Sequence, residues 1–387
     1  MKSAILYIIL YLFFFLTPME SISLIQGGHF SLPKLSVIFL FAAFVMSSHI
    51  RKLRRSKFIG MFAVYFIWAF ISAVFSINIE GAILRCLSFL IPLLILLYIL
   101  NALIVDERII RNIMISFIIG CCVPVVIMMN FMVNGVGGNL DRMTALEQDQ
   151  NELSVMLCIA VSFVFILLKQ IKNKWARTLL ITFICLSLIA ILLTGSRTGF
   201  IILLGVSLLG LLSLGKKSLV WIVLLGIIII PMLLPYIPES NIERLLQTQE
   251  QLAEGDLTGR GYIWDRALNA FHNQAPIRMI IGVGYDQFPF LYNQSYGTFS
   301  APHNTYLATF VEQGLIGCII LLYILIFTFK KAFVLCRRNQ SLAYLGMLIP
   351  VLLAMMTLGL QTRRWLWIIL LLIYIMYKIS LNQKETR

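Results

Sequence analysis

The sequence predicts an all-α polytopic membrane protein with about twelve transmembrane helices, and its composition and length lead to this fold class. Of the 387 residues, 60% are hydrophobic and only 12% are charged, and the mean hydropathy is +0.92. Soluble domains contain about 25% charged residues, so the composition excludes a soluble enzyme, a disordered regulator and a fibrous repeat protein. Because one span needs roughly 20 apolar residues, a chain of this length has room for about a dozen.

The predicted spans follow from the apolar segments of the chain, which we expect to form a single integral membrane domain over 1–387. Lys2 and the apolar run after it also resemble a signal peptide, but the segment Thr17-Pro18-Met19-Glu20 is a poor cleavage site. We therefore expect the first span to be retained. The predicted spans cover 3–19, 35–50, 58–77, 83–104, 113–133, 153–171, 178–194, 198–214, 219–237, 308–330, 344–360 and 364–380.

The net charge of +14 is explained by membrane topology. Cytoplasmic loops of membrane proteins carry an excess of Lys and Arg. With the N-terminus in the cytoplasm, the stretches predicted to be inside carry 21 of the 31 basic residues and only three of the 17 acidic ones. We therefore expect both termini to be cytoplasmic. The surplus charge can also hold the inner face against anionic lipid headgroups, and it requires no nucleic-acid partner.

The cysteines and histidines give no sign of a metal site. None of the seven cysteines lies in a clearly external loop, and there is no Cys-x-x-Cys motif. We interpret them as packing residues inside helices. The four histidines lack metal-ligand spacing, so we expect no metal and no other cofactor.

Two predicted external loops are long, covering 134–152 and, between the ninth and tenth spans, 238–307. An unstructured loop of the second length would be unusual, which indicates a functional and partly helical segment. Apolar residues at helical spacing indicate one helix in 239–253 and another in 261–271. Such helices can lie on the outer leaflet or pack over the bundle.

The few basic residues predicted to be outside include Arg142, Arg197, Arg260 and Arg266. An arginine at a membrane edge is costly unless it is paired or faces a polar cavity. Guanidinium groups suit phosphate oxygens, so we predict that several of these arginines hold a lipid diphosphate. The alternative is that each one reaches lipid headgroups or pairs with an external acidic residue.

His303 lies at the start of the tenth span. A neutral histidine can take a proton from an attacking hydroxyl, although a histidine at a helix start more often caps the helix. Glu312, nine residues later, could pair with an arginine or orient the site. We interpret Arg363 and Arg364, between the last two spans, as interfacial anchors, with a role in a cavity as the alternative.

Short motifs follow one another within 142–317, and together they resemble the O-antigen polymerase/ligase superfamily of bacterial membrane glycosyltransferases. The weakest is Asp149-Gln150-Asn151, where Gln replaces the Pro that the family often has. The stronger motifs are Thr194-Gly195-Ser196-Arg197, Gly259-Arg260 with Trp264, Gly282-Val283-Gly284, and His303-Asn304-Thr305-Tyr306-Leu307 followed by Glu312-Gln313-Gly314-Leu315-Ile316-Gly317.

The resemblance implies an enzyme of the cytoplasmic (inner) membrane that acts at its outer face on glycans linked to undecaprenyl diphosphate. It implies that Arg197 and Arg260 bind the diphosphate and stabilise it as the leaving group. It also implies that His303 activates the acceptor hydroxyl, without a metal or a nucleotide sugar. The supporting substrate-binding residues would be Arg142, Asn151, Arg266, Asn304 and Glu312.

Three functions fit these expectations. The first is a polymerase that builds O-antigen, capsule or another exopolysaccharide from lipid-linked repeat units, together with other polysaccharide assembly proteins. The second is an O-antigen ligase, whose acceptor is lipid A–core. We prefer the polymerase because no distinct site for lipid A–core is evident. The third is a flippase for lipid-linked oligosaccharides, but a transporter would more often place charged residues near the bilayer midplane and show internal repeats.

Overall fold

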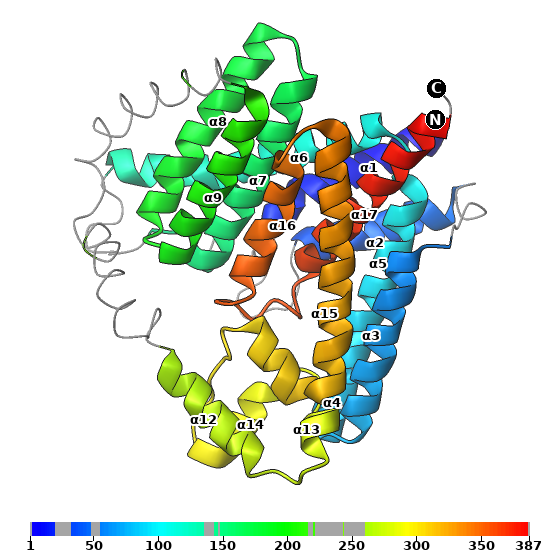
Figure 1. Cartoon of the computed structure of the whole chain (residues 1–387), viewed down its shortest axis with the longest axis vertical. Coiled ribbons are helices and arrows are strands. Elements are labelled where there is room, and N and C mark those ends of the chain that lie inside the picture. The colour runs from blue at the N-terminus through cyan, green and yellow to red at the C-terminus, as the bar shows by residue number, and fades with distance from the viewer. Residues whose placement is uncertain are drawn as a thin grey trace.

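The computed structural model describes residues 2–19, 32–47, 55–134, 143–145, 148–215, 220, 243 and 260–385. Across these residues the regular elements are helices and none is a strand (Figure 1). Eight continuous helical segments, one of them made of α4, η3 and α5 (Ile79–Leu103), are long and apolar enough to cross a membrane. The helical fold class is thereby confirmed, and the count of about twelve spans stays a prediction. Apart from the single residues 220 and 243, the predicted span 219–237 and the predicted helix in 239–253 lie outside the described residues, as does Arg142.

The helices follow the predicted apolar segments closely, and beside the eight candidate spans three described apolar helices are shorter than a full span. The short ones are α1, α2 and α16, of 15, 14 and 12 residues. The described elements are α1 (Lys2–Leu16), η1 (Thr17–Met19), α2 (Leu32–Val45), α3 (Lys57–Val74), α4 (Ile79–Arg85), the π-helix η3 (Cys86–Leu90), α5 (Ile91–Leu103), α6 (Glu107–Asn134), α7 (Gln150–Gln170), α8 (Lys174–Leu193), α9 (Arg197–Leu214), α12 (Gly261–His272), α13 (Arg278–Ile281), α14 (Phe288–Tyr296), α15 (Thr305–Asn339), α16 (Ala343–Ala354) and α17 (Arg364–Glu385).

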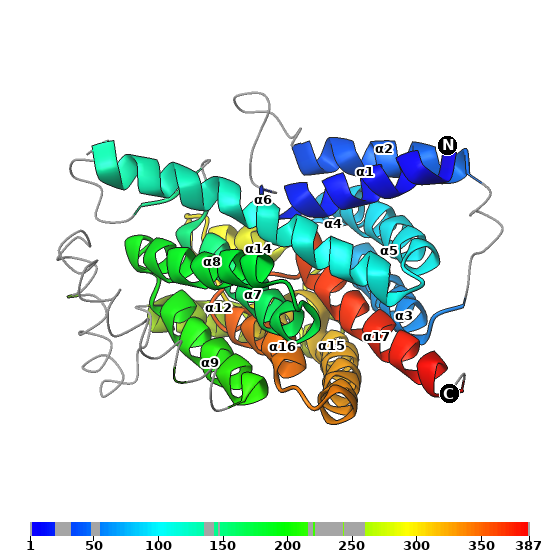
Figure 2. The same cartoon turned by 90° about the horizontal axis from the view of Figure 1, so that it is seen from above.

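Helix α7 lies at the centre of the bundle. Every residue from Glu152 to Leu168 is buried, and α6, α8, α9 and α16 pack around the helix. Helices α1, α2 and α6 form a layer on one side of the bundle (Figure 2). A helix buried on all faces must be apolar on all faces, and from Leu153 to Leu168 this one carries no charged residue.

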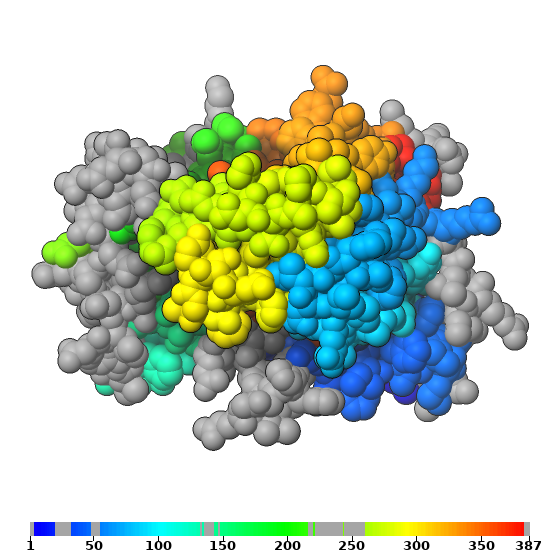
Figure 3. Space-filling model, turned by 90° about the horizontal axis from the view of Figure 1, so that it is seen from below, coloured from blue at the N-terminus to red at the C-terminus, as the bar shows by residue number. Residues whose placement is uncertain are grey.

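The segment from 260 to 300 and the adjoining ends of α3 and α4 cover one end of the bundle (Figure 3). Helix α12 packs against α14 through a small cluster of its own, which includes Phe271, Phe288 and Leu291. Helix α12 is the predicted amphipathic helix of 261–271, and its buried residues are Ala267, Ala270 and Phe271. It packs over the bundle, one of the two arrangements predicted from its sequence.

A break in α15 shapes the chain next to the site. Gly314 has φ +67° and ψ −168°, which is outside helical geometry. The chain at 282–284 runs beside this break, and the N–H groups of Val283 and Gly284 donate to the carbonyls of Val311 and Glu312, both at 2.9 Å. An ideal Cβ on Gly314 would lie 2.2 Å from the carbonyl oxygen of Ile280, so only glycine permits this close approach.

Candidate functional site

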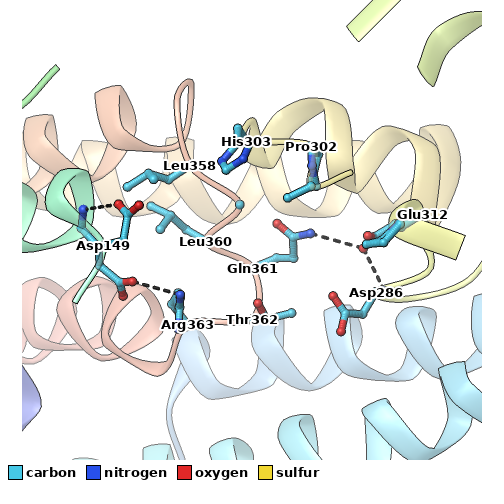
Figure 4. A pocket seen from close by; sticks show the side chains of 14 residues that line it. Asp149, Asp286, Pro302, His303, Glu312, Leu358, Leu360, Gln361, Thr362 and Arg363 are labelled. Carbon is cyan, nitrogen blue, oxygen red and sulfur yellow. Dashed lines mark hydrogen bonds and ion pairs between the residues drawn. The ribbon is translucent and has the colours of Figure 1, made fainter. Parts of the chain in front are cut away.

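A cavity of about 230 Å³ lies where four separate parts of the chain meet (Figure 4). The parts are the start of α7, the turn before α14 with the first turn of that helix, the segment that leads into α15 with the first turns of that helix, and the connection between α16 and α17. The lining residues are Asp149, Glu152, Asp286, Pro289, Ala301, Pro302, His303, Glu312, Leu358, Gly359, Leu360, Gln361, Thr362 and Arg363.

Glu312 organises one end of the cavity. Its side chain is buried, and its two carboxylate oxygens accept from the N–H of Asp286 at 2.9 Å and the N–H of Phe288 at 3.2 Å. The amide Nε2 of Gln361 donates to the same carboxylate at 3.3 Å. The sequence predicted that Glu312 binds substrate, pairs with an arginine or orients the site. In the structure its contacts fix the turn at 286–288.

Asp286 forms an ion pair beside Glu312. Its carboxylate lies 2.6 Å from the Nε of Arg85, the last residue of α4. Partial burial raises the pKa of Asp286, and the guanidinium of Arg85 opposes this effect. Asp286 also has φ +60°, an uncommon conformation for a residue other than glycine. The ion pair with Arg85 and the constrained backbone therefore fix the carboxylate of Asp286 in the cavity wall.

The opposite end of the cavity is formed by the start of α7. The carboxylate of Asp149 caps this helix by accepting from the N–H of Glu152 at 3.0 Å. Glu152 is buried, lies 3.0 Å from the guanidinium of Arg363, and accepts from the indole N–H of Trp365 at 2.9 Å. The position of Arg363 in the cavity wall agrees with the cavity role that the sequence left as an alternative.

His303 lines the cavity. It directly precedes Asn304, whose side chain caps α15 by accepting from the N–H of Leu307. Burial lowers the pKa of His303, and the positive charge of Arg260 lowers it further, while Asp149 opposes them. The imidazole is therefore neutral near pH 7. His303 has φ +45°, and such strain is typical of functional sites.

Arg260 lies beside the cavity lining, at the residue before α12. Its guanidinium donates to the carbonyl of Thr357. Partial burial lowers the pKa of Arg260, and the nearby carboxylate of Asp149 opposes this shift. The indole of Trp264 donates to the carbonyl of Pro302 at 3.0 Å. The Gly-Arg-x-x-x-Trp motif thus attaches α12 to the segment that carries His303.

Arg197 begins α9, on a turn that is bound to the first turn of α7. The hydroxyl of Ser196 donates to the side-chain oxygen of Asn151 at 2.9 Å, and the hydroxyls of Ser154 and Thr194 lie 2.9 Å apart. Arg197 and Asn151 are not among the lining residues. The structure nevertheless brings both to the end of α7 where Asp149 lines the cavity.

Two other predicted residues have structural contacts away from the lining. The guanidinium of Arg266 lies 4.0 Å from the ring centre of Tyr262 and 4.8 Å from that of Tyr296, so it joins α12 to α14. Asn304 caps α15. Among the residues that the structure describes, no group of three or more His, Cys, Asp or Glu side chains could hold a metal ion.

The sequence did not identify Asp286, Glu152 or Gln361 as site residues. Each is a polar residue next to a long apolar segment, and polar residues at a membrane edge are costly unless they have a partner or a function. That signal could have indicated them. Their convergence depends on contacts between distant parts of the chain, such as the one between Gln361 and Glu312.

Residues 181–322 match a family model described as O-antigen ligase. The match includes Arg197, Arg260 and His303, and it confirms the resemblance to the O-antigen polymerase/ligase superfamily. The start of α7 and the connection between α16 and α17 lie outside the matched residues. No curated protein matches the chain.

Proposed function

We propose that this member of the O-antigen polymerase/ligase superfamily transfers glycan from undecaprenyl diphosphate to a sugar hydroxyl at the outer face of the cytoplasmic membrane. The acceptor is the next lipid-linked repeat unit, which makes the protein a polymerase of O-antigen, capsule or another exopolysaccharide. One observation carries this proposal. His303 lines a cavity, and its pKa is lowered by burial and by the positive charge of Arg260.

His303 serves as the general base. The acceptor hydroxyl oxygen attacks the anomeric carbon of the donor sugar, and the hydroxyl proton passes to the neutral imidazole. The bond between the anomeric carbon and the phosphate oxygen breaks, and undecaprenyl diphosphate leaves with that electron pair. A base must be unprotonated to act, and burial together with Arg260 keeps His303 in this form.

Arg260 and Arg197 stabilise the diphosphate as negative charge builds on it. Each lies at the start of a helix, α12 and α9 respectively, where the helix dipole also favours an anion. Both arginines are near Asp149. The charge of Asp149 acts on the guanidinium of Arg260. Arg197 follows Ser196, whose hydroxyl donates to Asn151, two residues after Asp149. This arrangement supports a donor site beside the cavity and an acceptor site within it.

The second candidate is an O-antigen ligase, which uses the same donor and transfers finished glycan to lipid A–core. The description of the matched family favours it. Deletion of the gene separates the candidates when the surface glycan is examined by gel. Core with a single repeat unit indicates a polymerase, and bare core with long glycan on the carrier lipid indicates a ligase. Bare core with single repeats on the inner leaflet indicates a flippase and contradicts both.

The site is tested by His303→Ala and Arg260→Ala, expressed at the wild-type level in the deletion strain. Loss of a general base costs about 10²–10⁴-fold in rate, so we expect glycan transfer to fall by that amount in the histidine variant. His272→Ala is the matched control, because His272 is exposed at the end of α12. Full activity in both site variants would show that the assignment is wrong.

A further inference from the structure

The exposed apolar side chains of α15 form a stripe that runs from Leu315 to Phe333, and no large apolar side chain is exposed between Thr305 and Gly314. At a rise of 1.5 Å per residue the stripe is roughly 27 Å long. This length is close to the roughly 30 Å hydrocarbon core of a bilayer. Leu315, directly after the break at Gly314, therefore lies at one edge of the core, and we call this level the hydrocarbon edge. The stripe consists of Leu315, Ile319, Leu322, Tyr323, Ile326, Phe329 and Phe333.

Helix α3 reaches the same level with its last turn. The indole of Trp68 donates to the carbonyl of Gln313 at 2.9 Å, and the hydroxyl of Ser72 donates to the carbonyl of Glu312 at 2.8 Å. Phe75, directly after α3, is 55% exposed. The exposed apolar residues of this span are Val64, Ile67, Ile71, Val74 and Phe75. Its lipid-facing surface thus ends near the hydrocarbon edge of α15.

Helix α13 is fixed to both spans at this level. It packs against α15 (Figure 1), and the carbonyl oxygen of Ile280 would lie 2.2 Å from an ideal Cβ on Gly314. The guanidinium of Arg278 donates to the carbonyl of Phe75 and, at 3.3 Å, to that of Gly282. The short helix therefore lies beside the end of α3 and the break in α15.

Two large apolar side chains of this segment remain uncovered. Ile277, the residue before α13, is 55% exposed, and Ile280 is 44% exposed. Residues three apart lie on the same face of a helix, so the two side chains form one patch. The backbone contacts of α13 place this patch next to Phe75 and Leu315, and it continues the lipid-facing surface of the two spans.

Arg278 lies between the two isoleucines, and its charge favours a lipid surface over an apolar protein partner. Its bonds run to backbone carbonyls, and no carboxylate among the described residues forms an ion pair with it. The positive charge is therefore not neutralised at this level. Arginines at a membrane edge direct the charged group to the interface, where lipid phosphates lie.

We propose that Ile277 and α13 form a membrane-interface segment. Ile277 and Ile280 insert among the acyl chains at the hydrocarbon edge, and the guanidinium of Arg278 lies at the level of the headgroup phosphates. The chain continues from α13 through Gly282 to Asp286 in the cavity wall, so the bilayer supports the turn that carries this carboxylate. The inference does not rest on the proposed function, because it assumes nothing about the reaction.

The test maps lipid contacts on the wild-type protein in nanodiscs of phosphatidylethanolamine and phosphatidylglycerol. Two photoreactive phosphatidylcholines are compared, one with a diazirine close to the ester group and one with the diazirine at the end of the acyl chain. Mass spectrometry identifies the labelled residues. Ile277 and Ile280 should be labelled, and the ratio of labelling by the first probe to labelling by the second should equal that of Leu315. This ratio should exceed that of Ile326 at least about twofold, because Ile326 lies near the middle of the core.

Gln294 is the control for unspecific labelling, because it is exposed on α14 and polar, and it should stay unlabelled. The proposal is overturned if Leu315 is labelled while Ile277 and Ile280 are not. Labelling of Gln294 as strong as that of Ile280 would also overturn it. Crosslinks between the α13 segments of two copies, with no lipid adduct, would make the patch an interface between copies and reject the lipid contact.

Ile277→Asp combined with Ile280→Asp gives an independent measurement. A carboxylate at a membrane position is destabilising, whereas a surface substitution in water changes stability little. The double variant should therefore unfold in nanodiscs at a lower temperature than the wild type, and Gln294→Asp should unfold at the wild-type temperature. Equal unfolding temperatures of all three proteins would contradict the insertion of α13. If the double variant does not fold, the labelling of the wild-type protein decides the question.

Discussion

Replacement of Gly314 by alanine should unfold the part of the site that holds Glu312. The backbone at Gly314 has φ +67°, and its Cβ would lie 2.2 Å from the carbonyl oxygen of Ile280 and 2.7 Å from the backbone nitrogen of Gly282. Real Cβ atoms essentially never approach closer than 3.0 Å. The chain at 280–282 would therefore have to move away by at least about 0.8 Å, against packing that resists such shifts.

The cost of this change has two parts. A residue other than glycine with the φ and ψ of Gly314 costs about 1–3 kcal/mol in backbone strain. Moving the chain at 280–282 also strains the hydrogen bonds from Val283 to Val311 and from Gly284 to Glu312, and each buried group left unpaired costs about 1–3 kcal/mol. We expect a total above about 4 kcal/mol, which is exceptional for one substitution.

Gly215→Ala separates the two parts, because Gly215 has φ +85° and ψ 163°, close to the backbone conformation of Gly314, and nothing lies within 4 Å of its would-be Cβ. It should lose only the about 1–3 kcal/mol of backbone strain. The assay is thermal unfolding of both variants in the same detergent, with size-exclusion chromatography as the readout of the folded fraction. Glycan transfer is measured in parallel. If Gly314→Ala unfolds at the same temperature as Gly215→Ala, the close approach has no energetic importance and the reasoning is refuted.

Two further predictions concern charge. Glycan transfer should decline as the pH falls through the pKa of His303, which lies below the ordinary value of about 6.5. The positive charge of Arg260 lowers that pKa, so Arg260→Gln should move the decline to higher pH. Arg260→Lys keeps the charge and should leave the decline in place. A pH–rate profile unchanged in Arg260→Gln would contradict this. Glu152→Leu removes the acceptor of Trp365 and the partner of Arg363, so it should destabilise the protein by about 2–4 kcal/mol, while Glu152→Gln, which keeps an acceptor, should lose less. Equal thermal unfolding of these two variants would refute the importance of the indole contact.

The fold was largely predictable because a membrane span needs a long apolar run, and such runs are visible in the sequence. Helices α3 to α9 and α15 to α17 lie where apolar segments were found. Other features depend on contacts that hydropathy does not report. Helix α15 continues to Asn339, well beyond the predicted end at 330, and its last turn carries Arg337 and Arg338, whose positive charge is favourable at a helix C-terminus. The π-helix at Cys86–Leu90 has no signature in the sequence.

The site was predictable in part. Motif order predicted that His303 and Glu312 belong to one site, and both line the cavity. Arg266 was predicted as a substrate ligand from its charge, but stacking between two tyrosines gives it a structural partner that no linear pattern reveals. Gln361 became visible only when packing placed its amide against a carboxylate 49 residues away.

The cavity wall is drawn from both sides of the family-matched segment, and this division has an evolutionary consequence. His303, Arg260 and Arg197 lie within 181–322, whereas the connection that carries Gln361 follows α16 and lies outside it. Substitutions in that short connection can therefore reshape the cavity wall while the segment that carries the family match stays unchanged.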